Sequence, residues 1–545
     1  MSRIIAESPE PPDPMLPSTR HPRSPAMPPV ALRPTPAGRR APAPGAAVPA
    51  LVAALLVAPL PALAQAPPPP LADFDAYVTR AVGDWDAVGL AVAVVKDGEL
   101  VFARGYGVRD LEGGGAVDAD TRFSIGSTTK AMSAAAIGML VDEGKLDWDD
   151  PVTEHLPGFQ LSDPWLTREI TIRDLLTHRA GIGNADHLWY EVETDRDEIL
   201  ERFAYAPVAY SPRSSFIYQN IMYAAAGSVV EAVSGMPWAT FVQRRIFDPL
   251  GMDGTRPLLS DVEGEPNVAR PHDRVDGERV PIANASVDPV DAAGSVWSSV
   301  NDMSLWLRLL LADGVTAEGE RLLDSATVAE LFRPQTLVPR DQFYPTARLT
   351  RPHWTTYGLG WFQHDYRGHK LDFHTGSIDG MVAIAGLVRE EGLGVYVLAN
   401  LDHVEVRHAL LYRVLDLYLA PEDDVRDWSA ELKTLYDGLA ADGAARTAEA
   451  EANRVDGVPP SHDLSAYVGR YGAPGYGDLE VTRADDGLHI RRGPGLEGPL
   501  AHWHYDTFRA EWDAAWRGTA LVSFETGSDG TVSALRLGGL RLERR

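Results

Sequence analysis

The sequence contains no cysteine among its 545 residues. Disulfide bonds, thiolate nucleophiles and cysteine-ligated metals are therefore excluded. The motifs H-E-x-x-H, G-x-x-x-x-G-K-[ST] and G-x-S-x-G are absent as well. Their absence removes the sequence signatures of zinc peptidases, P-loop nucleotide hydrolases and nucleophile-elbow hydrolases.

Positive charge is scarce relative to negative charge. The chain has 50 Lys and Arg against 77 Asp and Glu, which gives a formal net charge of -27. Such a balance argues against nucleic acid or an anionic membrane surface as a partner. The residues are 45% hydrophobic and 23% charged. These shares are ordinary for a globular protein with a large core, and the length favours more than one domain.

Residues 1–40 are rich in proline and arginine and have no apolar period. Arg39 and Arg40 precede an apolar stretch at residues 46–63, and Ala62-Leu63-Ala64 supplies a small-x-small site. This pattern predicts a signal peptide in residues 1–64 that is cleaved after Ala64, and hence a periplasmic or secreted protein without stable membrane insertion. An uncleaved anchor is the alternative. Residues 65–71 form a Pro-rich linker in this interpretation.

Residues 72–420 are predicted to form one α+β domain. Residues 90–108 alternate apolar and polar positions around Lys96-Asp97-Gly98, and residues 381–400 do so around Glu391-Gly392, so both segments are predicted hairpins. Helical periods fill much of the region between them. We therefore expect an antiparallel sheet built from both ends of the domain and flanked by helices, with a helical subdomain.

The remainder of the chain contains two segments that differ in composition. Residues 421–460 are charged and rich in alanine and end in Pro-Pro, which is typical of a helical linker. Residues 461–545 alternate short strand-like runs with glycine-rich turns. This segment is predicted to be a small all-β, barrel-like domain.

The segment "FSIGSTTKAMSAAAIGMLVDEGK", residues 123–145, places Ser127 and Lys130 at the start of a helix that is apolar nearly all round. A buried ammonium group is costly unless it is paired or loses its charge. Because the two residues are three apart, both side chains lie on one helix face. A neutral Lys130 could then act as the base that removes the proton of a Ser127 nucleophile. The alternative is an N-cap serine beside a lysine that extends to solvent.

Two further motifs follow in order along the chain. Tyr218-Gln219-Asn220 is the only Y-x-N, and His374-Thr375-Gly376 is the only H-x-G. With S-x-x-K, this set resembles the serine β-lactamase and penicillin-binding protein superfamily, in particular the class C-related branch with family VIII esterases and D-aminopeptidases. The resemblance covers residues 75–420 and implies a β-lactamase/transpeptidase-like α/β sandwich. The C-terminal segment resembles the lipocalin-like domain appended to some of these hydrolases.

The resemblance implies a metal-free and cofactor-free acyl-enzyme mechanism. It assigns catalytic roles to Ser127 as the nucleophile and to Lys130 and Tyr218 as acid and base. It also assigns a catalytic role to His374, which stands where many relatives carry lysine. Substrate-binding roles fall on Asn220, Thr375, Gly376 and Ser377. The backbone N–H groups of Ser127 and Ser377 are expected to hold the oxyanion.

Several of these residues also have a purely structural interpretation. Tyr218 could be a buried aromatic residue, Asn220 a helix cap, and His374 a residue that only orients its strand. His178 is interpreted as structural, closing a turn behind the site. Ser299, in a second S-x-N string, is predicted to be a helix cap.

The expected substrate is a small ester, amide or peptide. Histidine with an ordinary pKa near ~6.5 carries only a partial charge at neutral pH, so strong β-lactamase action is less expected than cleavage of esters or small amides. D-aminopeptidase or DD-peptidase activity, weak β-lactamase activity, and a penicillin-binding sensor that is acylated without turnover remain alternatives. The sequence decides neither the natural substrate nor the oligomeric state.

Overall fold

The computed structural model describes residues 68–484, 487–493 and 495–545. The predicted signal peptide, its cleavage site and residues 65–67 lie outside these ranges. In the described part of the chain, no helix combines the length and the apolar character that a membrane span requires.

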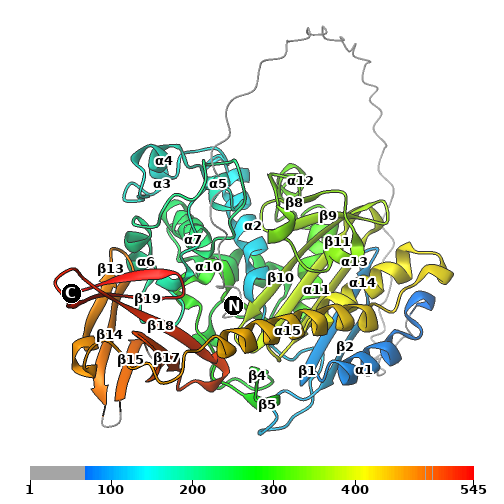
Figure 1. Cartoon of the computed structure of the whole chain (residues 1–545). Coiled ribbons are helices and arrows are strands. Elements are labelled where there is room, and N and C mark those ends of the chain that lie inside the picture. The colour runs from blue at the N-terminus through cyan, green and yellow to red at the C-terminus, as the bar shows by residue number, and fades with distance from the viewer. Residues whose placement is uncertain (1–67, 485–486, 494) are drawn as a thin grey trace, which may run out of the picture. The chain divides into compact units, whose positions relative to one another are not determined.

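An eight-stranded sheet forms the centre of the first domain (Figure 1). Its strand order is β2-β1-β12-β11-β10-β9-β8-β7, and every neighbouring pair is antiparallel. The strands are β1 (Gly89–Lys96), β2 (Glu99–Gly107), β7 (Thr336–Leu337), β8 (Thr355–Tyr357), β9 (Phe362–Tyr366), β10 (His369–Ile378), β11 (Met381–Val388) and β12 (Leu393–Ala399). The first and last long segments of the domain therefore meet at the β1–β12 pair, as predicted.

Strand β1 shows why the domain has three layers. Its residues are apolar and almost all fully buried, which is typical of a strand covered on both faces. Ala91, Ala93 and Val95 belong to one hydrophobic core, which contains helices α2 (Thr129–Asp142), α7 (Asn220–Ser234) and α11 (Val300–Leu311). The alternate residues belong to a second core with α1 (Phe74–Asp84) and α14 (Val406–Leu419). The sheet is thus sandwiched between two helical layers.

Shorter elements complete the helical layer around α2 and α7. The helices are α3 (Val152–His155), α4 (Pro164–Glu169), α5 (Ile172–Leu175), α6 (Arg196–Phe203), α8 (Trp238–Val242), α9 (Asp248–Leu250), α10 (Asp291–Gly294) and α12 (Ser325–Leu331). Helix α13 (Ala347–Thr350) packs instead against the second core. Two small sheets pair β3 (Phe123–Ser124) with β6 (Trp297–Ser298), and β4 (His272–Val275) with β5 (Glu278–Pro281).

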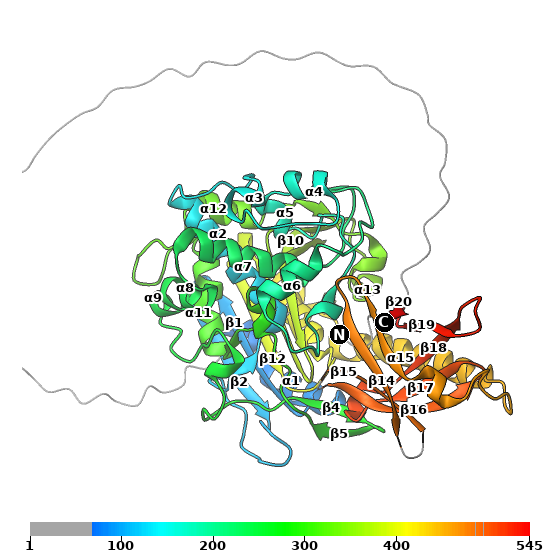
Figure 2. The same cartoon turned by 90° about the vertical axis from the view of Figure 1, so that its left-hand side faces the viewer.

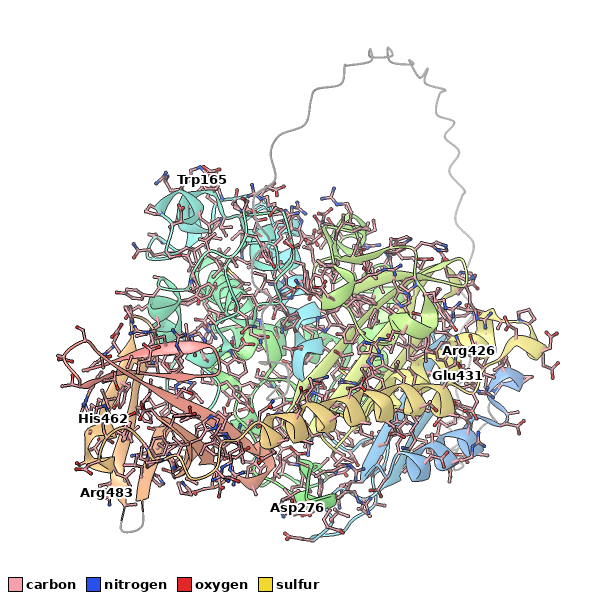
Figure 3. All side chains as sticks on the ribbon, in the orientation of Figure 1. Trp165, Asp276, Arg426, Glu431, His462 and Arg483 are labelled. Carbon is pink, nitrogen blue, oxygen red and sulfur yellow. The ribbon has the colours of Figure 1, made fainter. Side chains whose placement is uncertain are left out.

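Helix α15 (Trp428–Ala452) connects the sandwich to the C-terminal segment. Its first turn is anchored, because buried Trp428 packs against Tyr412 with ring centroids 4.8 Å apart. Arg426 donates a hydrogen bond of 3.0 Å to Glu431 beside this anchor (Figure 3). The later turns are mostly exposed, so the helix is held at its beginning.

Residues 469–544 form a closed barrel of eight antiparallel strands, drawn in orange to red in Figure 2. The strands are β13 (Gly469–Ala473), β14 (Gly477–Ala484), β15 (Gly487–Gly493), β16 (Leu496–His504), β17 (Thr507–Glu511), β18 (Thr519–Thr526), β19 (Val532–Leu537) and β20 (Leu540–Arg544). Pairing of β13 with β20 closes the barrel. Its interior is filled by apolar and aromatic side chains, among them Tyr467, Tyr471 and Phe524.

The structure confirms the predicted fold class. Both hairpins form at the expected turns, and His374-Thr375-Gly376 lies on strand β10. Ser299 is the N-cap of α11, and its hydroxyl accepts a hydrogen bond from the backbone N–H of Asp302. The C-terminal segment forms a closed barrel, which confirms the predicted barrel-like domain.

Candidate active site

Ser127 lies on a short 3-10 helix, η2 (Gly126–Thr128), that leads directly into α2. Gly126 has a φ of +51°, a conformation that residues with a side chain rarely adopt. The turn presents Ser127 as a partly exposed residue, although both of its neighbours are buried. The serine hydroxyl is thus accessible at the edge of a densely packed region.

Lys130 is fully buried one turn later on α2. Its Nζ lies 3.0 Å from Ser127 Oγ, 2.7 Å from Asn220 Oδ1 and 2.9 Å from the carbonyl oxygen of Ala293. Two of these partners can only accept hydrogen bonds, whereas the serine hydroxyl can donate one. The ammonium form can donate to all three partners, and a neutral amine, with two N–H donors and one lone pair, satisfies them as well when Ser127 donates to the lone pair.

The electrostatic setting of Lys130 favours this neutral form. Burial lowers the pKa of Lys130 from 10.5 to about 7, while the nearby carboxylate of Asp186 acts in the opposite direction. At neutral pH the amine is therefore present in both protonation states. This is the property that a general base requires.

Tyr218 stands beside the same pair. Lys130 Nζ lies 4.8 Å from the centroid of the Tyr218 ring, and Ser127 is a hydrogen-bond partner of the Tyr218 hydroxyl. Burial raises the pKa of Tyr218 well above its ordinary range, and the hydrogen bond with Ser127 only partly opposes this effect. The phenol therefore keeps its proton at neutral pH. His178 packs against the ring with centroids 4.4 Å apart and accepts a hydrogen bond from the backbone N–H of Gln219, which places it behind the site as predicted.

Asn220, the first residue of α7, points its side chain at Lys130 rather than capping the helix. Its amide nitrogen donates to both carboxylate oxygens of Asp186 at 3.0 Å, which fixes the amide oxygen toward Lys130. Trp189 Nε1 in turn donates to Asp186 at 2.9 Å. Asp186 and Trp189 were not predicted from the sequence, because they lie in and beside a 3-10 helix, η3 (Asp186–Leu188), that matches no motif.

Strand β10 brings the third motif against η2. A Cβ atom added to Gly376 would lie 1.9 Å from the carbonyl oxygen of Ile125, so only glycine permits this approach. A Cβ atom on Gly126 would lie 2.8 Å from the backbone nitrogen of Ser377. The backbone of Ser377 is therefore adjacent to the turn that carries Ser127.

His374 is buried next to Tyr218 and faces the interior. Its Nδ1 lies 2.6 Å from the carbonyl oxygen of Thr375, to which it donates, so its Nε2 accepts from the Tyr357 hydroxyl at 3.0 Å. Burial, aided by the charge of Lys130, lowers the pKa of His374 to about 3. The partial positive charge expected from an ordinary histidine pKa is therefore absent at neutral pH.

The side chains of Thr375 and Ser377 have other partners. The Thr375 hydroxyl lies 2.7 Å from the hydroxyl of Tyr344, and Ser377 Oγ accepts a hydrogen bond of 3.0 Å from Arg407. Because alternate residues of a strand share a face, both side chains lie on the side of β10 away from His374. The part of Ser377 that is placed beside Ser127 is its backbone.

A hollow of about 10 Å³ adjoins Ser127, Asn220 and Ser377. Its walls are apolar and come from Trp189, Val287, Val290, Ala293 and Ile378. This volume is far smaller than the roughly 300–1,000 Å³ of pockets that enclose drug-sized ligands. It has room for about one water-sized group beside Ser127.

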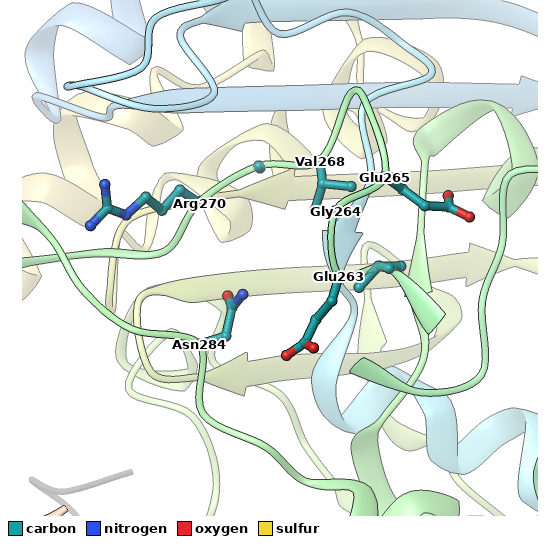
Figure 4. Close-up of a pocket in the computed structure, with 8 residues that line it drawn as sticks. Glu263, Gly264, Glu265, Val268, Arg270 and Asn284 are labelled. Atoms are coloured by element: carbon teal, nitrogen blue, oxygen red, sulfur yellow. The ribbon is translucent and has the colours of Figure 1, made fainter. Parts of the chain in front are cut away.

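A larger hollow of about 260 Å³ lies elsewhere on the domain (Figure 4). It is lined by Val262, Glu263, Gly264, Glu265, Val268, Ala269, Arg270 and Asn284. These residues include no side chain that could serve as a nucleophile with an adjacent base, so size alone does not mark this hollow as the reactive site. Within the described ranges, no three His, Asp or Glu side chains are grouped as a metal site would require.

Comparisons with known proteins identify the family of the chain. The family model for Beta-lactamase matches residues 74–420, and a model for a domain of unknown function, DUF3471, matches residues 453–544. Unguisins hydrolase ungD from Aspergillus violaceofuscus is 31% identical over 77% of this chain and 78% of its own length. Esterase EstB from Burkholderia gladioli is 34% identical over 33% of this chain and 50% of its own length.

Among solved structures, the octameric penicillin-binding protein homologue from Pyrococcus abyssi matches with a TM-score of 0.57 and 22% identity. The match covers 87% of this chain and 99% of that structure, and it bears on the fold alone. The buried Ser127–Lys130 pair thus lies inside the region that the family model matches. The chain belongs to the beta-lactamase family and is a serine hydrolase of that family with a C-terminal β-barrel.

Proposed function

We propose that this hydrolase cleaves esters or small amides through an acyl-enzyme formed on Ser127. The observation that carries the proposal is the set of three partners around buried Lys130 Nζ, at 3.0, 2.7 and 2.9 Å. These partners suit a neutral amine whose lone pair faces the serine hydroxyl. A lysine in this state can remove the proton of Ser127 as the serine oxygen attacks an acyl carbonyl.

The remaining steps follow from the neighbours. The carbonyl oxygen gains a negative charge, which the backbone N–H groups of Ser127 and Ser377 would stabilise. Tyr218, which keeps its proton, would donate it to the leaving group as the bond to the acyl carbon breaks, and would recover a proton from Lys130. In deacylation, water attacks the acyl carbon while the Lys130–Tyr218 pair takes its proton. The pair passes this proton to Ser127 Oγ as the bond from Oγ to the acyl carbon breaks and the acid is released. Asn220 holds Lys130 in place throughout.

The neutral state of His374 favours substrates without a carboxylate at that position. A histidine with a pKa of about 3 supplies no fixed positive charge, so strong β-lactamase or carboxypeptidase action lacks its usual ionic partner. Export through a signal peptide cleaved after Ala64 is part of the same proposal. Intact mass of the protein recovered from the periplasm or medium would test that cleavage.

The function is tested with purified protein and a Ser127→Ala variant on p-nitrophenyl acetate, D-alanyl-p-nitroanilide and nitrocefin, with intact mass read at the end. We expect ester turnover that is lost in the variant, with little nitrocefin cleavage. Faster D-alanyl release would identify an aminopeptidase. A stable adduct without turnover would identify a sensor. Activity that survives in Ser127→Ala would contradict the proposed nucleophile.

The pH profile of kcat/KM is expected to have one acidic limb centred near pH 7. Lys130 must be neutral to accept a proton, and its pKa is about 7, so activity should rise with pH through this value and then level off. His374 should contribute nothing between pH 5 and 9, because its pKa is about 3. Ester hydrolysis followed at a wavelength insensitive to product ionisation would check the profile. A flat profile down to pH 5 would refute a titrating Lys130.

Replacing Asp186 with asparagine should change both the profile and the rate. The carboxylate raises the pKa of Lys130, so its removal should move the acidic limb to lower pH, by about one unit for a close buried charge. The substitution also weakens the hydrogen bonds that orient the Asn220 amide. We therefore expect kcat to fall about tenfold. Exposed Asp437→Asn on α15 is the matched control. An unshifted limb in Asp186→Asn would contradict the assigned charge coupling.

A further inference from the structure

The segment 186–191 links the catalytic cluster to the barrel. Asp186 and Trp189 face the cluster, where Asp186 binds Asn220 and Trp189 lines the small hollow. The other side of the segment meets the barrel: Arg492 donates to the carbonyl oxygen of His187. A Cβ atom on Gly493 would lie 2.4 Å from the carbonyl oxygen of Glu191, so the two backbones are in close contact.

Arg517 makes the most extensive of these contacts. It ends a short 3-10 helix, η11 (Ala515–Arg517), between barrel strands β17 and β18, and its side chain is only 5% exposed. Its Nη1 donates to the Tyr190 hydroxyl at 2.9 Å, and its Nη2 donates to Asp379 Oδ2 at 2.9 Å and to Glu191. Tyr190 also donates to Asp379, at 2.6 and 2.7 Å from the two carboxylate oxygens. One buried guanidinium therefore joins two separate stretches of the first domain.

Each of those two stretches adjoins a residue that lines the hollow beside Ser127. Tyr190 directly follows Trp189, and Asp379 directly follows Ile378. Trp189 and Ile378 both line the hollow. Because a side chain cannot move far when the backbone of its neighbour is fixed, the Arg517 contacts set the distance between Trp189 and Ile378.

The chemistry of the hollow limits what it can accept. The described residues that line it include no charged side chain. The titratable groups around it already have partners, since Lys130 contacts Ser127, Asn220 and Ala293, and Arg517 is bound by Glu191 and Asp379. A charged group placed there would lose its hydration without gaining a partner. Tyr218 is not among the residues that line the hollow.

We propose that Arg517 is a positioning residue that sets the width of an acyl pocket, so that the hydrolase selects esters or amides of short, uncharged acyl groups. The inference rests on the proposed acyl-enzyme function and specifies its substrate class. The barrel thereby contributes to specificity without touching the reacting atoms. It does so by holding Trp189 and Ile378 through their sequence neighbours.

The test is a series of p-nitrophenyl esters, acetate, butyrate and octanoate, measured as kcat and KM on the full chain. Wild type should prefer acetate and butyrate to octanoate. In Arg517→Met, the ratio of kcat/KM for octanoate to that for acetate should rise at least about tenfold, the size of discrimination that one methylene confers in an apolar pocket. KM for acetate should rise while kcat changes little, because the groups around Ser127 are unaltered.

Tyr190→Phe is the second variant, which removes the hydroxyl that joins Arg517 and Asp379 but keeps the ring. It should shift the ratio in the same direction even if Arg517→Met does not fold. Exposed Arg536→Met on β19 is the matched control and should match wild type.

An unchanged ratio in the folded variants, or an equal loss on all three esters, would overturn the inference. Faster hydrolysis of a p-nitrophenyl hemisuccinate than of the butyrate by wild type would overturn the uncharged specificity. If wild type hydrolysed none of the esters in a Ser127-dependent way, the proposed function would be wrong, and the inference that rests on it would be wrong as well.

Discussion

Lys130→Met is expected to lower kcat by about 10²–10⁴-fold, which is the usual contribution of a general base, while KM changes little. Methionine fills a similar volume but offers no lone pair to the Ser127 proton. Its apolar side chain also suits a fully buried position, whereas Asn220 Oδ1 and the carbonyl oxygen of Ala293 each lose a donor. These effects oppose one another, so thermal unfolding should change by only a few degrees. Steady-state kinetics and calorimetry on the same samples would check both parts.

Lys130→Arg separates charge from basicity. A guanidinium stays protonated at all accessible pH values and cannot take the serine proton, so arginine should not restore activity. Lys145→Met removes a partly exposed lysine just beyond α2, paired with Glu143, and should behave as wild type. Activity in Lys130→Arg within tenfold of wild type would rule out the assigned base.

Gly376→Ala is expected to reduce kcat by at least about 10²–10³-fold, as does loss of one oxyanion donor. The new Cβ atom would lie 1.9 Å from the carbonyl oxygen of Ile125, so β10 and η2 must separate. This displacement carries the backbone of Ser377 away from Ser127. Overpacking of this kind also destabilises by about 1–3 kcal/mol. Ester kinetics combined with denaturant unfolding would measure both effects.

Gly438→Ala supplies the matched control for this substitution. Gly438 lies on the exposed part of α15, where an added Cβ atom would meet nothing within 4 Å. Alanine is preferred over glycine in a helix by roughly 1 kcal/mol, so this variant should keep full activity and gain slightly in stability. Nearly normal kcat in Gly376→Ala would show that the close contact between β10 and η2 does not position the oxyanion site.

The main architecture could be predicted because its signals are local. Alternating apolar residues on both sides of Lys96-Asp97-Gly98 predict the first hairpin, and β1 and β2 form there. Because predicted strands lie at both ends of the domain with helices between them, these strands were expected to pair in one sheet. The short strands β7 and β8 carry no such signal, since two or three residues cannot display a period. Their position depends on the sheet edge that they extend.

The candidate site was predictable only where the residues belong to ordered motifs. Ser127, Lys130, Tyr218 and Asn220 meet in space as the resemblance implies, although their individual roles remain proposals. Asp186 was missed because its importance comes entirely from its contact with Asn220. The charge state of His374 was also misjudged, because burial and the proximity of Lys130 arise from tertiary packing. Arg517 acts from a different domain, and no sequence pattern connects it to Ser127.

The pairing of β1 with β12 has a consequence for how the protein is made. Leu90 is opposite Ala399 in the sheet, so β1 must wait for a strand that is synthesised much later. At translation rates of about 5–20 residues per second, the interval is about 15–60 s. During this time the nascent β1–β2 hairpin exposes an apolar strand whose residues are almost all buried in the finished sheet. The first domain therefore cannot pair β1 with β12 during translation until β12 has left the ribosome, and the apolar strand β1 stays without this partner for that interval.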